Sequence, residues 1–114
     1  MTISAPIAAS ACCAPLVHET MSAADAISLA AKFKALADPT RLRLLSLVAS
    51  TESAEACVCD LTGPVELSQP TVSHHLKVLV DAGLLTRSKR GTWSFYALVP
   101  GALDELATVL TSAQ

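Results

Sequence analysis

The chain alternates between segments with helical apolar spacing and short polar breaks that begin with good helix caps. From Ala23, a mostly apolar, alanine-rich stretch predicts a helix to about Leu36. The next segment, ADPTRLRLLSLV, offers Asp38 as an N-cap and Pro39 in the first helical position, which predicts a second helix over residues 39–50. We expect the buried face of this second helix to hold Leu42, Leu45, Leu47 and Val48.

The middle of the chain contains a predicted loop, a short helix and a longer capped helix. We expect STESAEA to be a loop and CVCDLTGPVE to be a short third helix at most, because Gly63 and Pro64 disfavour helix interiors. Ser68 then caps a fourth helix over residues 69–82, and Gly83 is the residue expected to end it. The apolar stripe of this fourth helix is formed by Val72, Leu76, Leu79 and Val80.

The last third of the chain changes to a strand-like pattern and then returns to a helix. LLTRSKRGTWSFYALV alternates on both arms around SKRGT, which predicts a β-hairpin with Gly91 near its turn, and PGALDELATVLTSAQ predicts a fifth helix. The fold class is therefore mainly α with a small β-hairpin, in the order of a winged helix-turn-helix over residues 23–112. Residues 1–22 lack helical periodicity and are expected to form a flexible N-terminal arm.

Apolar composition favours a chain that buries surface against a second copy. The sequence has 114 residues, of which 52% are hydrophobic, and residues 24–36 and 101–112 are apolar on more than one side. One small core would leave such helices with a larger apolar patch than monomers usually expose. We therefore expect a homodimer joined through the first and last helices.

The local charge of one segment indicates nucleic-acid binding, although the net charge of the whole chain does not. The net charge is −2, yet residues 68–98 carry Lys77, Arg87, Lys89 and Arg90 against only Asp81. A basic hairpin tip suits phosphates, and polar groups on a capped helix suit a groove of double-stranded DNA. Either feature alone is commonly an ordinary solvated surface, but both in this order favour operator binding. The candidate DNA-binding residues are Ser68, Gln69, Thr71, Ser73, His74, Lys77, Arg87, Lys89 and Arg90.

The four cysteines form two close pairs, Cys57 with Cys59 and Cys12 with Cys13. The apolar start of the chain has no Lys or Arg before Lys32, so the basic beginning of an export signal is missing. We expect a cytoplasmic chain without membrane association, whose thiols stay reduced. In that compartment paired cysteines act as metal ligands or redox groups more often than as structural disulfides.

The spacing of the thiols restricts how they can hold an ion. Residues two apart on a regular helix point to different sides, so Cys57 and Cys59 share an ion only if the helix starts at or after them. Adjacent Cys12 and Cys13 chelate poorly on a rigid element, but a flexible arm removes that objection. The C-x-C spacing does not match the C-x-x-C pair of thiol redox enzymes, and we expect no enzyme activity. A DNA-binding protein that senses redox state through a disulfide remains an alternative.

Three segments, FKALADPTRLRLLSLV, EACVCDL and LSQPTVSHHLKVLVDAGLL, resemble the ArsR/SmtB family of metal-responsive winged-helix repressors over roughly residues 24–112. CVCDL is similar to the metal-binding box of the arsenic, antimony, cadmium and lead sensors. The resemblance implies a homodimer joined through its first and last helices, bound to its operator without metal and released by metal. The pair Gly63-Pro64 and the second thiol pair in the arm depart from the common pattern.

The inducer expected from soft thiolate ligands is As(III) or Sb(III), with Cd(II) or Pb(II) as the alternative. The expected metal ligands are Cys57, Cys59, Cys12 and Cys13. The zinc, cobalt and nickel sites of the family lie on the last helix and need histidine. That segment here has Asp104 and Glu105 but no His or Cys, so we expect no zinc site on it.

Overall fold

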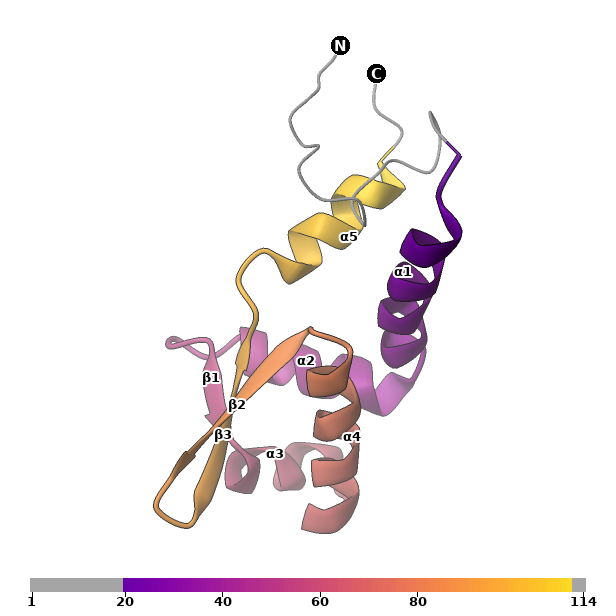
Figure 1. Ribbon diagram of the computed structural model, residues 1–114. Helices are drawn as coiled ribbons and strands as arrows, with labels where there is room; N and C mark the ends of the chain where they lie inside the picture. Colours follow the sequence, from indigo (N-terminus) through magenta and orange to yellow (C-terminus); the bar gives the residue numbers. More distant parts are fainter. Residues whose placement is uncertain (1–19, 112–114) are drawn as a thin grey trace. The chain divides into compact units, whose positions relative to one another are not determined.

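The computed structural model describes residues 20–111, which form five helices and three strands (Figure 1). The described residues divide into two compact units, one spanning Lys32–Val99 and the other made of residues 20–31 and 100–111. The elements in chain order are α1 (Ala23–Leu36), α2 (Pro39–Ala49), β1 (Glu55–Cys57), α3 (Val58–Val65), α4 (Gln69–Asp81), β2 (Leu85–Arg90), β3 (Trp93–Leu98) and α5 (Ala102–Leu110).

The caps predicted from the sequence set the ends of α2 and α4. Asp38 accepts hydrogen bonds from the backbone N–H groups of Thr40 and Arg41, and Ser68 accepts one from that of Thr71. At the far end of α4, Gly83 has φ +83° and donates to the Val80 carbonyl, while Leu84 donates to the Leu79 carbonyl. These bonds close the helix in a Schellman motif, so the predicted role of Gly83 is confirmed.

The prediction that STESAEA is entirely a loop was wrong at its end. Residues Glu55–Cys57 form β1, which pairs antiparallel with β3 in a sheet of order β1-β3-β2. Cys57 lies opposite Phe95 in this register. The strand depends on pairing with β3, about forty positions later in the chain, so its own three residues carry little signal.

The prediction of a short third helix is confirmed, since α3 has eight residues, but the expectation that Gly63 and Pro64 would be unfavourable inside it was wrong. Both lie inside α3, which continues to Val65. Pro64 falls in the last turn, where it removes only one backbone donor. Glu66 then adopts a left-handed conformation with φ 56°, and Leu67 donates to the Thr62 carbonyl, which ends the helix.

The core of the unit Lys32–Val99 lies between α2, α3, α4 and the sheet. Its largest fully buried side chains are Leu44, Val48, Val72, Leu76, Leu79, Leu84 and Leu85. On α2 the buried face includes Leu44 rather than the expected Leu42, which is 51% exposed. Within residues 20–111 no charged side chain is buried, so apolar packing accounts for this core.

The helices α1 and α5 keep large apolar side chains at the surface as well as buried ones. Leu106 and Val109 of α5 are buried, whereas Leu110 is 56% exposed and Ile27 of α1 is 73% exposed. Within the described range, no helix has both the length and the apolar character needed to cross a bilayer.

The N-cap of α2 leads to a prediction on stability. The hydrogen bond from the Arg41 backbone N–H is the main cause that holds the pKa of Asp38 below its usual value. A folded-state pKa below the unfolded one means that this stabilisation is complete above about pH 4 and is lost as the pH falls through the folded pKa. We expect Asp38→Ala to lower the midpoint of thermal unfolding by several degrees near neutral pH, and the difference from wild type to narrow in acid. A difference that stays constant down to about pH 2 would contradict a charged cap.

Candidate nucleic-acid interface and thiol pair

One face of α4 is buried and the opposite face is open to solvent. Val72, Leu76 and Leu79 pack into the core at helical spacing, and the polar positions between them therefore point outward. Of the candidates on this helix and its cap, Ser68, Gln69, Thr71, His74 and Lys77 are exposed and Ser73 is half-buried. The Ser68 hydroxyl also lies 3.0 Å from the Thr71 hydroxyl, so part of its hydrogen-bonding capacity is used within the chain.

Arg41 of α2 connects α4 to the end of α1. Its Nε donates to the Ala35 carbonyl at the end of α1 over 2.6 Å, and its Nη1 donates to His75 Nδ1 on α4 over 3.2 Å. The position of α4 is thus set by its buried apolar face and by the hydrogen bond between Arg41 and His75. No pattern along the chain indicates this contact, because Arg41 and His75 are 34 positions apart.

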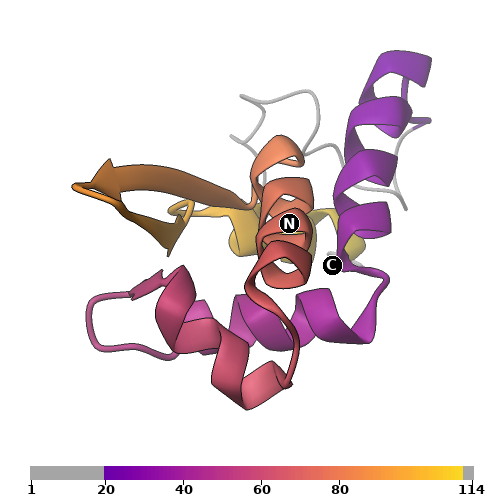
Figure 2. The ribbon, with the colours of Figure 1, turned by 90° about the horizontal axis from the view of Figure 1, so that it is seen from below.

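The hairpin β2–β3 projects from the helices of its unit and carries the remaining candidate cations (Figures 1 and 2). Arg90 pairs with Trp93 at the end of the ladder, and Gly91 in the turn has φ +65°. Five of the six residues of β2 are exposed, including Lys89. The predicted hairpin and its turn are therefore confirmed, and its basic strand faces solvent.

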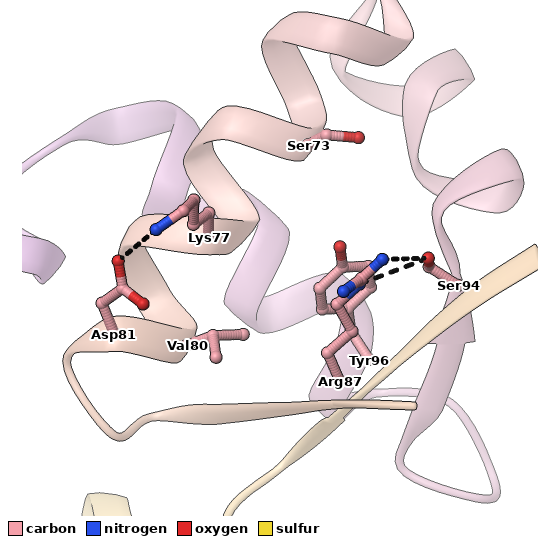
Figure 3. A pocket seen from close by; sticks show the side chains of 7 residues that line it. All are labelled: Ser73, Lys77, Val80, Asp81, Arg87, Ser94 and Tyr96. Atoms are coloured by element: carbon pink, nitrogen blue, oxygen red, sulfur yellow. Dashed lines mark hydrogen bonds and ion pairs between the residues drawn. The ribbon is translucent and has the colours of Figure 1, made fainter. Parts of the chain in front are cut away.

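A hollow of about 370 Å³ lies between α4 and the hairpin (Figure 3). Ser73, Lys77, Val80, Asp81, Arg87, Ser94 and Tyr96 line it. Lys77 pairs with Asp81 over 2.9 Å, and Arg87 donates to the Ser94 hydroxyl from Nε and Nη2. The hollow therefore brings a cation of the helix and a cation of the hairpin to the same surface. Ser94 and Tyr96 were not among the predicted site residues, although strand alternation places them on the same face of the hairpin as Arg87, which pairs with Tyr96.

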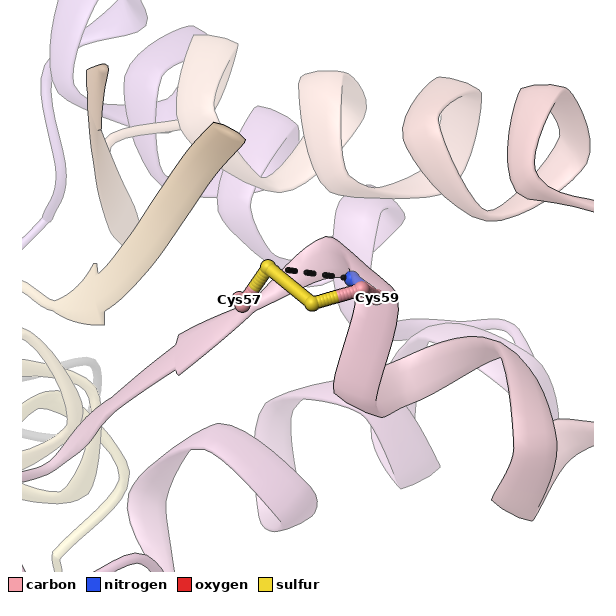
Figure 4. The surroundings of a disulfide bond; sticks show 2 residues. All are labelled: Cys57 and Cys59. Atoms are coloured by element: carbon pink, nitrogen blue, oxygen red, sulfur yellow. Dashed lines mark hydrogen bonds between the residues drawn. A yellow bond between two sulfur atoms is a disulfide. The ribbon is translucent and has the colours of Figure 1, made fainter. Parts of the chain in front are cut away.

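The thiols of Cys57 and Cys59 meet where β1 passes into α3 (Figure 4). Cys57 is the extended N-cap residue, and its sulfur accepts a hydrogen bond from the Cys59 backbone N–H over 3.3 Å. The Cα atoms are 5.2 Å apart and the two sulfurs are joined in a disulfide. Cys57 is buried and Cys59 is exposed, so the pair is open to solvent on one side. Because α3 begins at Val58, the two sulfurs point the same way. This is the arrangement that the sequence analysis predicted to be necessary if both cysteines hold one ion.

Further ligands for an ion are not found next to this pair in the part of the chain that is described. Residues 20–111 contain no group of three or more His, Cys, Asp or Glu side chains placed to hold a metal ion. Cys12 and Cys13, the other predicted ligands, lie outside the described residues. The two described thiols can supply two soft donors once reduced.

The order of these parts is that of a winged helix-turn-helix: α3, a turn, the exposed helix α4 and a basic hairpin. The profile of the family described as "Bacterial regulatory protein, arsR family" matches residues 38–87. The chain is 46% identical over 78 residues to the arsenical resistance operon repressor of Bacillus subtilis (strain 168), covering 65% of this chain and 72% of that one. This chain belongs to the ArsR family.

Solved structures of ArsR-like regulators share the fold. A crystal structure of a possible transcriptional regulator for arsenical resistance matches with a TM-score of 0.60 and 37% identity, covering 67% of this chain and 76% of that one. The homodimeric winged helix-turn-helix domain Mb0332 of Mycobacterium bovis matches with a TM-score of 0.64 and 27% identity, covering 79% of each chain. The ArsR-family chain is thus a DNA-binding transcriptional repressor and not an enzyme.

Proposed function

We propose that this repressor binds operator DNA as a homodimer and is released when As(III) or Sb(III) binds the thiolates of Cys57 and Cys59. The observation that carries the proposal is the facing pair of sulfurs at the start of α3. α3 is the first helix of the helix-turn-helix, so an ion held there acts on the segment that supports α4. Soft thiolates favour soft ions, and the arsenical resistance repressor of Bacillus subtilis is a relative of this chain.

A third thiolate is proposed to come from Cys12 or Cys13. Arsenite and antimonite prefer three sulfur donors, and two are available at the start of α3. The arm of residues 1–22 is proposed to reach either its own α3 or that of the other subunit. Cd(II) and Pb(II), which take three or four thiolates, remain the alternative inducers.

The proposal is tested by titrating release from DNA. Reduced protein bound to a duplex selected on the wild type is challenged with arsenite, antimonite, cadmium, lead and zinc in a gel-shift assay. We expect release by arsenite and antimonite at the lowest concentrations and none by zinc. Release by cadmium or lead at lower concentrations would favour the alternative inducers, and retention with every ion would remove the inducer part of the proposal.

The DNA contacts are proposed to divide between α4 and the hairpin. Ser68, Gln69, Thr71, Ser73, His74 and Lys77 would read the major groove, whereas Arg87, Lys89 and Arg90 would contact phosphates. The exposed polar face of α4 and the exposed basic strand β2 support this division.

A wing that contacts phosphates makes a definite prediction for Lys89, which is exposed. Lys89→Ala should weaken binding for all sequences by a similar factor and flatten the slope of log affinity against log salt by about one unit. Lys34→Ala, which removes an exposed cation from α1, is the matched control and should leave the slope nearly unchanged. If both variants behave alike, the hairpin does not act as a wing.

A second candidate function, release by oxidation, is favoured by the disulfide between Cys57 and Cys59. In this case peroxide would oxidise the two thiols to the disulfide and be reduced to two waters. Peroxide would then release DNA without added metal, and a dithiol would restore binding. Arsenite without peroxide would leave the complex intact, which separates this function from the first.

A further inference from the structure

Arg90 at the end of β2 is held by two partners within the chain. Its Nη2 donates to Glu55 Oε2 of β1 over 2.6 Å, and its guanidinium lies over the Phe95 ring at 4.5 Å from the centroid. The Arg90 side chain is 56% exposed and that of Glu55 only 24%. An ion pair with a stacked guanidinium and a half-buried carboxylate has more fixed geometry than one between two free surface chains.

Lys89, the cation next to Arg90 in the hairpin, differs from it in having no acidic partner among the described residues. Lys89 makes no ion pair with any residue from 20 to 111, so its charge is available to a phosphate. The carboxylate of Glu55, in contrast, forms an ion pair with Arg90 and occupies this cation before DNA approaches. DNA binding through Arg90 therefore has to displace Glu55 first.

The same carboxylate belongs to the strand that carries a thiol. Glu55 and Cys57 are the first and last residues of β1, and Cys57 lies opposite Phe95, the ring under Arg90. Residues two apart in a strand share a face, so the side chains of Glu55 and Cys57 lie on the same face of the sheet. An ion on the Cys57 sulfur would therefore be held by the same short strand that supplies a partner of Arg90.

We propose that Glu55 competes with DNA phosphate for Arg90, and that an ion bound at Cys57 and Cys59 acts on the wing by keeping Glu55 in place. This inference rests on the proposed function, because it assigns the residue through which the thiol pair affects DNA affinity. Without the ion, β1 yields and Arg90 reaches the DNA. With the ion, β1 is fixed and Arg90 stays with the carboxylate.

The test compares Glu55→Gln with Glu52→Gln in the full-length, reduced protein. Glu52 is an exposed acid three positions earlier, and its variant loses the same charge. On a duplex selected on the wild type, Glu55→Gln should bind about two- to fivefold more tightly than Glu52→Gln without metal, the range expected from releasing one surface ion pair. Its salt slope should be steeper by up to about one unit. Added arsenite should reduce its affinity by a smaller factor than it reduces that of the wild type.

The role of Arg90 is isolated by adding Arg90→Gln to both variants. In that background the difference between Glu55→Gln and Glu52→Gln should disappear, because the group for which Glu55 competes is absent. A difference that persists, or equal affinities of the two single variants, would overturn the inference while leaving the proposed function intact. Failure of the wild type to bind DNA or to respond to arsenite would instead remove the proposed function.

Discussion

The variants Cys57→Ser and Cys59→Ser are expected to bind operator DNA like the wild type and to stay bound when arsenite is added. The hydroxyl of serine can replace the Cys57 sulfur as the N-cap acceptor for the Cys59 backbone N–H, so the start of α3 is preserved. Neither sulfur takes part in the proposed DNA contacts. Removing one of these two soft donors, however, leaves a single sulfur at the start of α3, so this segment no longer supplies the pair of thiolates that holds the ion.

The magnitude of this effect follows from linkage. A tenfold loss of operator affinity on inducer binding needs about 1.4 kcal/mol of coupling between the two sites. This is a small requirement beside the formation of several metal–sulfur bonds. The serine variants should lose the whole response, which a fluorescence-anisotropy titration with operator DNA would measure.

The arm cysteines provide the control for the third ligand. Cys12→Ser or Cys13→Ser alone should weaken the response, since either neighbour can replace the other, and the double variant should lose most of it. A double variant that responds like the wild type would show that the arm supplies no ligand. The site would then consist of Cys57 and Cys59 with an external thiol or water.

Breaking the proposed dimer should have the other large effect. Ile27 of α1 and Leu110 of α5 are 73% and 56% exposed, although both are large apolar side chains. We expect Ile27→Glu or Leu110→Glu to give monomers at micromolar concentration, because an interface would have to bury an unpaired charge. Operator affinity should fall by about a hundredfold or more, since linked half-sites bind with 10² to 10⁴ greater avidity than single ones.

Leu42→Glu is the matched control for the dimer variants. Leu42 is 51% exposed but belongs to α2, outside the helices proposed to form the interface. This variant should remain dimeric in sedimentation velocity and keep most of its DNA affinity. The interface is not formed by α1 and α5 if the wild type sediments as a monomer at micromolar concentration. The same conclusion follows if Leu42→Glu gives monomers while Ile27→Glu and Leu110→Glu remain dimeric.

Signals that act over a few residues were sufficient to predict most of the fold. Asp38, Ser68 and Gly83 each form hydrogen bonds with backbone groups of the helix end at which they lie. Their roles could therefore be assigned from residue type and position alone. The buried face of α2 was harder to predict, because leucines occupy positions on more than one side of this helix. The choice of Leu44 over Leu42 for burial is made by neighbouring elements.

The candidate site was predictable only in part, for a related reason. The spacing of Cys57 and Cys59 required a helix that begins near them, and α3 does so at Val58. The contacts of Glu55 with Arg90 and of Arg41 with His75 join residues 35 and 34 positions apart. No pattern along the chain indicates such pairs, because they depend on how β1 meets the hairpin and how α2 meets α4.

The strand order β1-β3-β2 leaves β2 as an outer strand of the sheet. Outer strands with free backbone groups tend to pair with other chains, and natural proteins discourage this with charged side chains. Arg87, Lys89 and Arg90 occupy that strand, so the cations proposed to meet phosphate also protect the protein from edge-to-edge aggregation. Replacing all three at once would expose a hydrogen-bonding edge without charge, and the resulting precipitation could be mistaken for lost DNA affinity. Their contributions are therefore best measured one substitution at a time.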